Sequence, residues 1–101
     1  MSLKKSLNRL DKELQFDPEY LAEGMAMDIT ESICQIMDQK GLNRTALATR
    51  MQTSNAYITK VLRGNANMTL LSIAKFAVAL EEPVERILFG LKLQKESVDL
   101  L

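Results

Sequence analysis

The stretch RTALATRMQTSNAYITKVLRG, from Arg44 to Gly64, decides the fold of this chain. Two short helices fit it, at about 44–51 and 55–62, because Asn43 and Ser54 are suitable N-caps and Gly64 ends the second helix. The apolar side chains recur at the three- and four-residue spacing of a helix face: Leu47, Ala48, Met51, Ile58, Val61 and Leu62. Two helices of this length joined by a tight turn form the outline of a helix-turn-helix.

Helical spacing continues on both sides of this stretch. Asp17, Pro18 and Gly41 mark the ends of a long helix from about 18 to 40. Its inward side chains are predicted to be Met25, Ile29, Ile33, Ile36 and Met37. Thr69 starts another helix, with Leu70, Ile73, Ala74, Ala77 and Leu80 inward. Pro83 opens a last one, with Val84, Ile87, Leu88 and Leu91 inward.

These elements predict an all-α protein, a compact bundle of about five helices with an extra N-terminal helix. Leu3, Leu7, Leu10 and Leu14 are spaced 4, 3 and 4 residues apart, as in two heptads of an amphipathic helix. We divide the chain into an N-terminal helical extension at 1–27, a helix-turn-helix domain at 28–90 and a C-terminal tail at 91–101.

The charges of the chain are segregated although they sum to zero, with 13 basic and 13 acidic side chains. Residues 1–38 carry four basic and eight acidic groups, and residues 81–101 carry three and five. Residues 39–80 carry six basic groups and no acid, so the three segments sum to −4, +6 and −2. A cationic block of this kind favours a polyanionic partner in spite of the neutral total.

Composition excludes several function classes. The chain has no histidine, which removes histidine triads and histidine metal ligands, and its acids lack calcium-loop spacing. We therefore expect no enzyme activity, no metal and no cofactor. No apolar run is long enough to cross a bilayer and no signal peptide is present, so we expect a cytoplasmic location and no membrane partner. The single cysteine, Cys34, is predicted to be a small buried hydrophobe.

The same residues resemble the helix-turn-helix of the Cro/repressor (XRE) family. The likeness includes the Leu47-Ala48 pair, Ser54 at the start of the second helix, its core anchors Ile58 and Val61, and Gly64. It covers about residues 28–90 and implies a lambda-repressor-like domain that binds double-stranded DNA. Gln52 stands where the family usually has glycine, so we expect it to adopt the left-handed conformation at some cost. Ala48 is small because the two helices cross almost in contact there.

The second helix is the recognition helix of such a motif and enters the major groove. With Ile58 and Val61 turned inward, the side chains expected to contact bases are Asn55, Ala56, Thr59 and Lys60. Asparagine suits adenine, alanine or a threonine methyl suits thymine, and lysine suits guanine or phosphate. Backbone contacts are expected from Arg44, Ser54, Tyr57, Arg63, Asn65 and Asn67. For Tyr57, packing on the flank of the protein is an equal alternative.

One recognition helix reads only a few base pairs, so a two-fold dimer is expected. In the family the dimer often uses the C-terminal helix, which here places Val84, Ile87, Leu88, Phe89 and Leu91 at the interface. The stripe Leu3 to Leu14 is the second candidate surface, and its alternative is packing onto its own domain.

Three functions remain open. The chain is a sequence-specific repressor that acts as a dimer, or an antitoxin of a type II toxin-antitoxin pair, resembling the HigA-like group, that binds a toxin and represses its own operon. The third alternative is a protein-interaction module with a degenerate helix-turn-helix.

Overall fold

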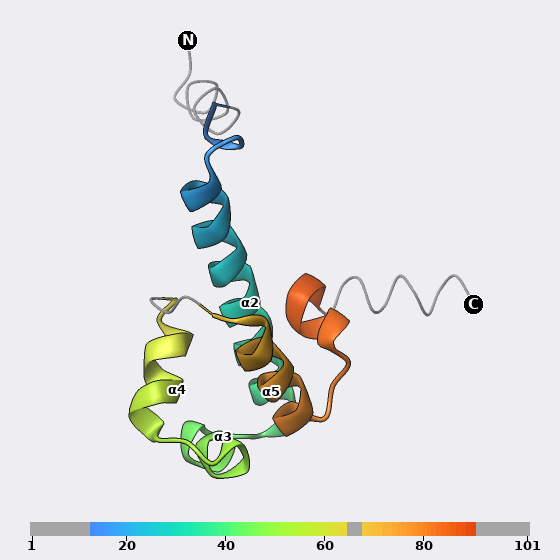
Figure 1. Cartoon of the computed structure of the whole chain (residues 1–101). Coiled ribbons are helices and arrows are strands. Elements are labelled where there is room, and N and C mark those ends of the chain that lie inside the picture. Colours follow the sequence, from blue (N-terminus) through green and yellow to red (C-terminus); the bar gives the residue numbers. More distant parts are fainter. Residues whose placement is uncertain (1–12, 65–67, 91–101) are drawn as a thin grey trace, which may run out of the picture.

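The computed structural model describes residues 13–64 and 68–90, and within these ranges the regular structure is entirely helical. The helices are α2 (Pro18–Lys40), α3 (Arg44–Met51), α4 (Asn55–Leu62), α5 (Leu70–Leu80) and a further helix at 84–90 (Figure 1). The predicted all-α bundle of about five helices is thereby confirmed. Leu3, Leu7, Leu10, Asn65, Asn67 and Leu91 lie outside the described residues.

The helices α2 to α5 begin where the sequence predicts a cap. The Asp17 carboxylate accepts from the Glu19 amide at 2.9 Å, and the Asn43 side chain accepts from the Ala46 amide at 2.8 Å. Ser54 and Thr69 cap α4 and α5 in the same way. These side chains satisfy amide groups that have no partner within the helix, so the caps hold the helix boundaries in place.

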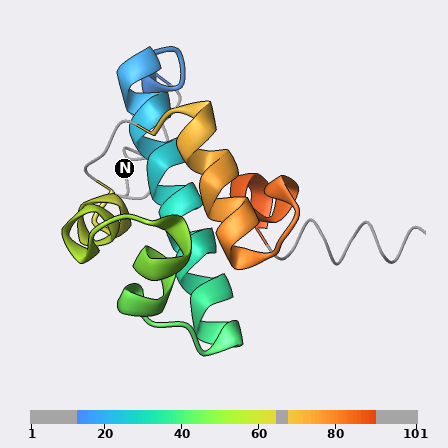
Figure 2. The ribbon, with the colours of Figure 1, turned by 60° about the horizontal axis from the view of Figure 1, so that its bottom comes forward.

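The core lies where α2 and α5 run side by side and α3 and α4 pack on one flank of this pair (Figure 2). Fully buried side chains from every helix meet there: Ile33, Ile36, Leu47, Ile58, Phe76, Leu80 and Ile87. Burial of this apolar surface is the main force that holds the short helices α3 and α4 in place, because helices of eight residues are marginal in isolation.

Four side chains predicted to be inward are exposed: Met25, Leu70, Ala74 and Cys34. The N-terminal half of α2 projects past the bundle, so Met25 is 61% exposed although it continues the face that Ile29 buries (Figure 1). Leu70 and Ala74 on α5 and Cys34 on α2 are also exposed. The partial burial of Cys34 still raises the pKa of its thiol, more than the charge of Arg44 lowers it.

The division placed between residues 27 and 28 falls inside α2, which is one continuous helix. Buried side chains of α2 begin at Ile29, one residue later. The three-part division itself stays a prediction.

Among the described residues, no helix is both long enough and apolar enough to cross a membrane.

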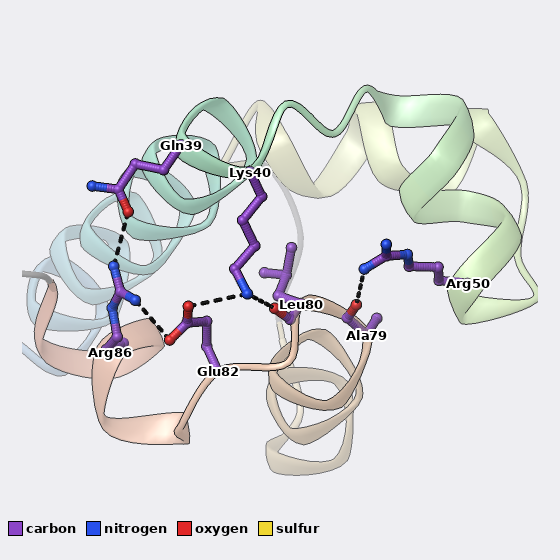
Figure 3. A network of polar contacts seen from close by, with 7 residues as sticks. All are labelled: Gln39, Lys40, Arg50, Ala79, Leu80, Glu82 and Arg86. Atoms are coloured by element: carbon purple, nitrogen blue, oxygen red, sulfur yellow. Dashed lines mark hydrogen bonds and ion pairs between the residues drawn. The ribbon is translucent and has the colours of Figure 1, made fainter.

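Two side chains of the cationic block at residues 39–80, Lys40 and Arg50, bind the C-terminal end of α5. The Lys40 ammonium donates to the carbonyl oxygen of Leu80 at 2.7 Å, and the Arg50 guanidinium donates to that of Ala79 at 3.0 Å (Figure 3). Carbonyls in the last turn of a helix lack intrahelical partners and carry the negative end of its dipole, so cations there are stabilising. Lys40 and Arg50 therefore tie α2 and α3 to α5.

Glu82 joins this end of α5 to the helix at 84–90. Its carboxylate lies 3.1 Å from the Lys40 ammonium and 2.7 Å from the Arg86 guanidinium, which also donates to the Gln39 side chain at 3.0 Å (Figure 3). The Glu82 side chain is only 11% exposed. Because both cationic partners hold it in a nearly buried position, this carboxylate contributes more than an ordinary surface ion pair.

Replacing Glu82 with glutamine is expected to lower the free energy of unfolding at pH 7 by about 1–3 kcal/mol, as for hydrogen bonds to charged groups. Burial alone raises the pKa of Glu82, but the hydrogen bonds and charges of Arg86 and Lys40 outweigh it and hold the pKa below its ordinary value. The stabilisation is complete above the unfolded pKa of about 4.3 and is lost as pH falls through the folded pKa.

Urea unfolding of the wild type and of Glu82→Gln between pH 7 and pH 3 measures this effect. The variant should lose less stability on acidification than the wild type. The control Glu85→Gln, at an exposed position three residues further along in the helix at 84–90, should change the free energy of unfolding by no more than about 0.5 kcal/mol. Equally steep acid profiles for wild type and Glu82→Gln would contradict the role of this carboxylate.

Candidate nucleic-acid interface

The rotation of α4 about its own axis is set by buried contacts. Ile58 is completely buried and Val61 nearly so, and both pack in the core with Leu47 and Ala48 of α3. The Thr30 hydroxyl of α2 donates to the Val61 carbonyl oxygen at 3.2 Å in a buried position. These contacts leave α4 one orientation, and the opposite side of the helix faces outward.

The four predicted base-contacting residues lie on this outer side. Asn55, Ala56 and Lys60 are exposed and Thr59 is half-buried. At 100° per residue they occupy an arc of about 140°. The outer face is therefore polar and cationic, and it begins at the first residue of α4.

The first turn of α3 meets this face through two hydrogen bonds. Asn55 Nδ2 donates to Thr45 Oγ1 at 3.2 Å, and the Arg44 guanidinium donates to Thr59 Oγ1 at 3.3 Å. Arg44 thus reaches the outer side of α4, where a cation can meet a phosphate beside the groove. Thr45 is absent from the sequence-predicted site, because apolar periodicity carries no signal for a polar contact between two exposed positions.

The turn between α3 and α4 contains the expected left-handed residue. Gln52 has a φ of 55°, and its amide donates to the Thr49 carbonyl oxygen at 3.1 Å. The conformation predicted at this position is therefore confirmed. Glutamine keeps the turn geometry of glycine at the cost of some backbone strain.

Tyr57 faces α5. Its ring is half-buried against the core, and its hydroxyl lies 3.4 Å from Ser72 Oγ. Of the two alternatives for this residue, the geometry favours packing on the flank of the protein. A contact of Tyr57 with the DNA backbone stays a prediction.

The remaining backbone-contact residues lie around α4. Ser54 is exposed at the N-cap of α4, and Arg63 is exposed at its C-cap. Asn65 and Asn67 fall outside the described residues, as stated above. Arg44, Lys60 and Arg63 form the cationic part of this region, whereas Lys40 and Arg50 bind the end of α5.

The residues predicted to form the dimer interface differ in how far their side chains are exposed. Ile87 is fully buried in the core of its own chain, so its side chain is not available to a partner. Val84 and Leu88 are half-buried, and Phe89 is 62% exposed. Phe89 and Leu88 line a shallow groove with Asp28 and Ser32 of α2.

Within the described residues, no group of three His, Cys, Asp or Glu side chains is placed to hold a metal ion.

Solved structures similar to this chain include the following two. One is a hypothetical transcription factor, NHTF, from Neisseria, with 22% sequence identity and a TM-score of 0.63 over 76% of this chain and 85% of that one. The other is the restriction-modification controller protein C.AhdI from Aeromonas hydrophila, with 26% identity and a TM-score of 0.58 over 61% of this chain and 94% of that one. No protein-family model and no curated protein matches the chain. The chain therefore shares its helical fold with these two proteins.

Proposed function

We propose that this protein is a sequence-specific DNA-binding regulator that uses α4 as its recognition helix and acts as a dimeric repressor. The observation that carries the proposal is the outer face of α4, which is polar, free of acidic side chains and held in one orientation by Ile58 and Val61. Helices of this length fit the major groove, and Arg63 at the C-cap of α4 and Arg44, which contacts Thr59 from α3, are suited to phosphate. The similarity to a transcription factor and a controller protein supports the proposal.

The proposed roles follow from position. Base edges are assigned to the outer face of α4: Asn55, Ala56, Thr59 and Lys60. Phosphates are assigned to the residues around it: Arg44, Ser54, Tyr57, Arg63, Asn65 and Asn67. Base contacts supply specificity, whereas phosphate contacts supply affinity and register for every sequence.

Two alanine variants test these roles. A binding site is first selected from random double-stranded DNA with the wild-type protein, and the affinity is then measured for every single-base change. Asn55→Ala should lose about 1–3 kcal/mol of discrimination at one base pair of each half-site. Arg63→Ala should weaken binding to all sequences by a similar factor. The assignment is wrong if the two variants have the same effect on every sequence.

We propose that two copies associate through the exposed side of the helix at 84–90. Phe89 is the large exposed apolar side chain there, and Val84 and Leu88 of the same helix are half-buried. Leu91 belongs to the proposed interface by its place in the sequence. A dimer presents two copies of α4 to half-sites about one helical turn apart. This doubling is needed because one short helix reads too few base pairs for useful specificity.

Phe89→Glu is expected to weaken dimerisation by about 30-fold or more, the effect of losing an aromatic hot spot. Sedimentation equilibrium over a range of concentrations measures the dissociation constant. Val78→Glu is the control, because Val78 is also apolar and exposed but lies on α5. Equal dissociation constants for the Phe89→Glu and Val78→Glu dimers would place the interface elsewhere, and the stripe Leu3 to Leu14 would be tested next.

A second candidate function is supported by the projecting half of α2. Glu19, Glu23 and Asp28 are exposed there, and this acidic surface suits a basic protein partner such as the toxin of a toxin-antitoxin pair. An adjacent reading frame for a small basic protein, bound by the wild type but not by a variant with these three acids changed to glutamine, is the expected finding. The absence of such a frame would remove this candidate.

A further inference from the structure

We infer that the outer side of α5 is a docking site for the projecting half of α2, residues 18–28, of a second copy of this chain. The contact is separate from the proposed dimer interface at 84–90 and does not involve DNA. The observation that carries it is the composition of α5, in which Ser72 and Lys75 are the only polar residues among eleven. A helix that is apolar all round is normally buried all round.

The side of α5 that faces away from the core is nevertheless open. Phe76 and Leu80 are completely buried, whereas Leu71 is 64% exposed and Val78 is 78% exposed on the opposite side of the helix. With Met51 of α3, these two exposed side chains line a groove of about 480 Å³. A contiguous exposed apolar surface marks an interaction site for another protein.

The charges along this groove are basic. Arg50 and Lys75 line it, and none of its lining residues in the described ranges 13–64 and 68–90 is acidic. The hydrogen bond from Arg50 to the Ala79 carbonyl oxygen, 3.0 Å long, holds one of the two charges at the end of α5 (Figure 3). The groove therefore suits an amphipathic helix whose apolar side chains are accompanied by acids.

The projecting half of α2 has this character. Leu21 is 45% exposed and Met25 is 61% exposed, one turn apart on one side of α2, where no other described helix covers them (Figure 1). Residues 18–28 carry three acidic side chains and no base. The acidic surface that suits a basic protein partner thus has a basic counterpart in the same sequence.

These two surfaces cannot meet within one chain. The helix α2 is continuous, and the open side of α5 faces away from the core that the two helices share. A second copy must therefore supply the projecting half of α2. Because different surfaces of the two copies meet, the contact is head-to-tail, and association does not stop at two copies. Val78→Glu changes this groove but leaves the helix at 84–90 unaltered.

Mixing two variants tests the head-to-tail contact. Both carry Phe89→Glu, which removes the proposed dimer contact. Met25→Lys places a cation opposite Arg50 and Lys75, and Leu71→Gln removes an apolar side chain from the groove. In sedimentation equilibrium, each variant should associate with itself at least about 10-fold more weakly than the Phe89→Glu protein. A mixture of the two should form a one-to-one complex about as tight as the Phe89→Glu contact, because each supplies the surface that the other lacks.

Met27→Lys in the same background is the matched control. Met27 is 67% exposed on the same half of α2 but lies about 160° around the helix from Met25, so its replacement should leave association unchanged. All these changes are at exposed positions, so melting temperatures should stay close to that of the wild type. Association of the Phe89→Glu protein should also weaken as the salt concentration rises, because exposed charges are screened.

Three results would overturn the inference. The first is a Phe89→Glu protein that stays monomeric at every concentration. The second is a mixture of the Met25→Lys and Leu71→Gln variants that associates no more tightly than either variant alone. The third is a loss of association in Met27→Lys equal to that in Met25→Lys.

Discussion

Replacing Ile58 with alanine is expected to lower the free energy of unfolding by about 2–5 kcal/mol. Ile58 is completely buried among α2, α3, α4 and α5, so the smaller side chain leaves a cavity that the short helix α4 cannot fill by shifting. Small domains are stable by only about 5–15 kcal/mol, so this loss is a large share of the total stability and should lower the melting temperature of the variant. Urea unfolding monitored by circular dichroism measures the loss.

Lys60→Ala is the matched control for this variant. Lys60 lies two residues further along α4 and is exposed, so its replacement should change the free energy of unfolding by no more than about 0.5 kcal/mol while weakening DNA binding. Ile58→Ala should weaken binding only as far as it unfolds the protein. A loss of less than 1 kcal/mol in Ile58→Ala would mean that α4 is not anchored by this residue.

Helix boundaries were predictable because they depend on local chemistry. Asp17, Asn43, Ser54 and Thr69 cap the helices that follow them, as expected of residues whose side chains accept from backbone amides. The left-handed φ of Gln52 was also predictable, from its place in a turn that usually contains glycine. The left-handed φ of 56° at Glu81 carried no such signal and was not predicted.

Burial was less predictable, because it depends on where neighbouring helices end. Periodicity places Met25 on the same face as Ile29, but no neighbouring helix extends far enough to cover it. Leu70 is 85% exposed for a related reason, since it is the first residue of α5 and lies beyond the core. A pattern along one helix cannot indicate how far its partners extend.

Contacts between exposed polar side chains were the least predictable. The hydrogen bond between Thr45 and Asn55 joins positions ten residues apart, and nothing in the spacing of residue types distinguishes it from two solvated side chains. The contacts of Lys40 and Arg50 were equally unpredictable. Both residues belong to the cationic block in the sequence, but in the fold their side chains donate to carbonyl oxygens of α5. The cationic surface beside α4 is therefore smaller than the block of residues 39–80 implied.

The salt dependence of DNA binding follows from this cationic surface. Arg44, Lys60 and Arg63 lie on or beside α4, so a dimer with about two to four phosphate contacts per subunit should release about four to eight counterions. Each neutralised phosphate contributes about −0.9 to the slope of log affinity against log salt concentration, which gives a slope of roughly −4 to −7. Affinity should then fall by about 10²- to 10⁴-fold between 50 and 200 mM salt.

Fluorescence anisotropy of the selected DNA duplex, titrated with wild-type protein at several salt concentrations, tests the central claim that this chain is a DNA-binding regulator. Arg63→Ala should make the slope less steep by about one unit for each Arg63 that contacts a phosphate. Sequence-specific binding with a slope of roughly −4 to −7 is expected. Absence of binding to any selected duplex, or binding independent of salt, would contradict this claim and favour the protein-interaction module.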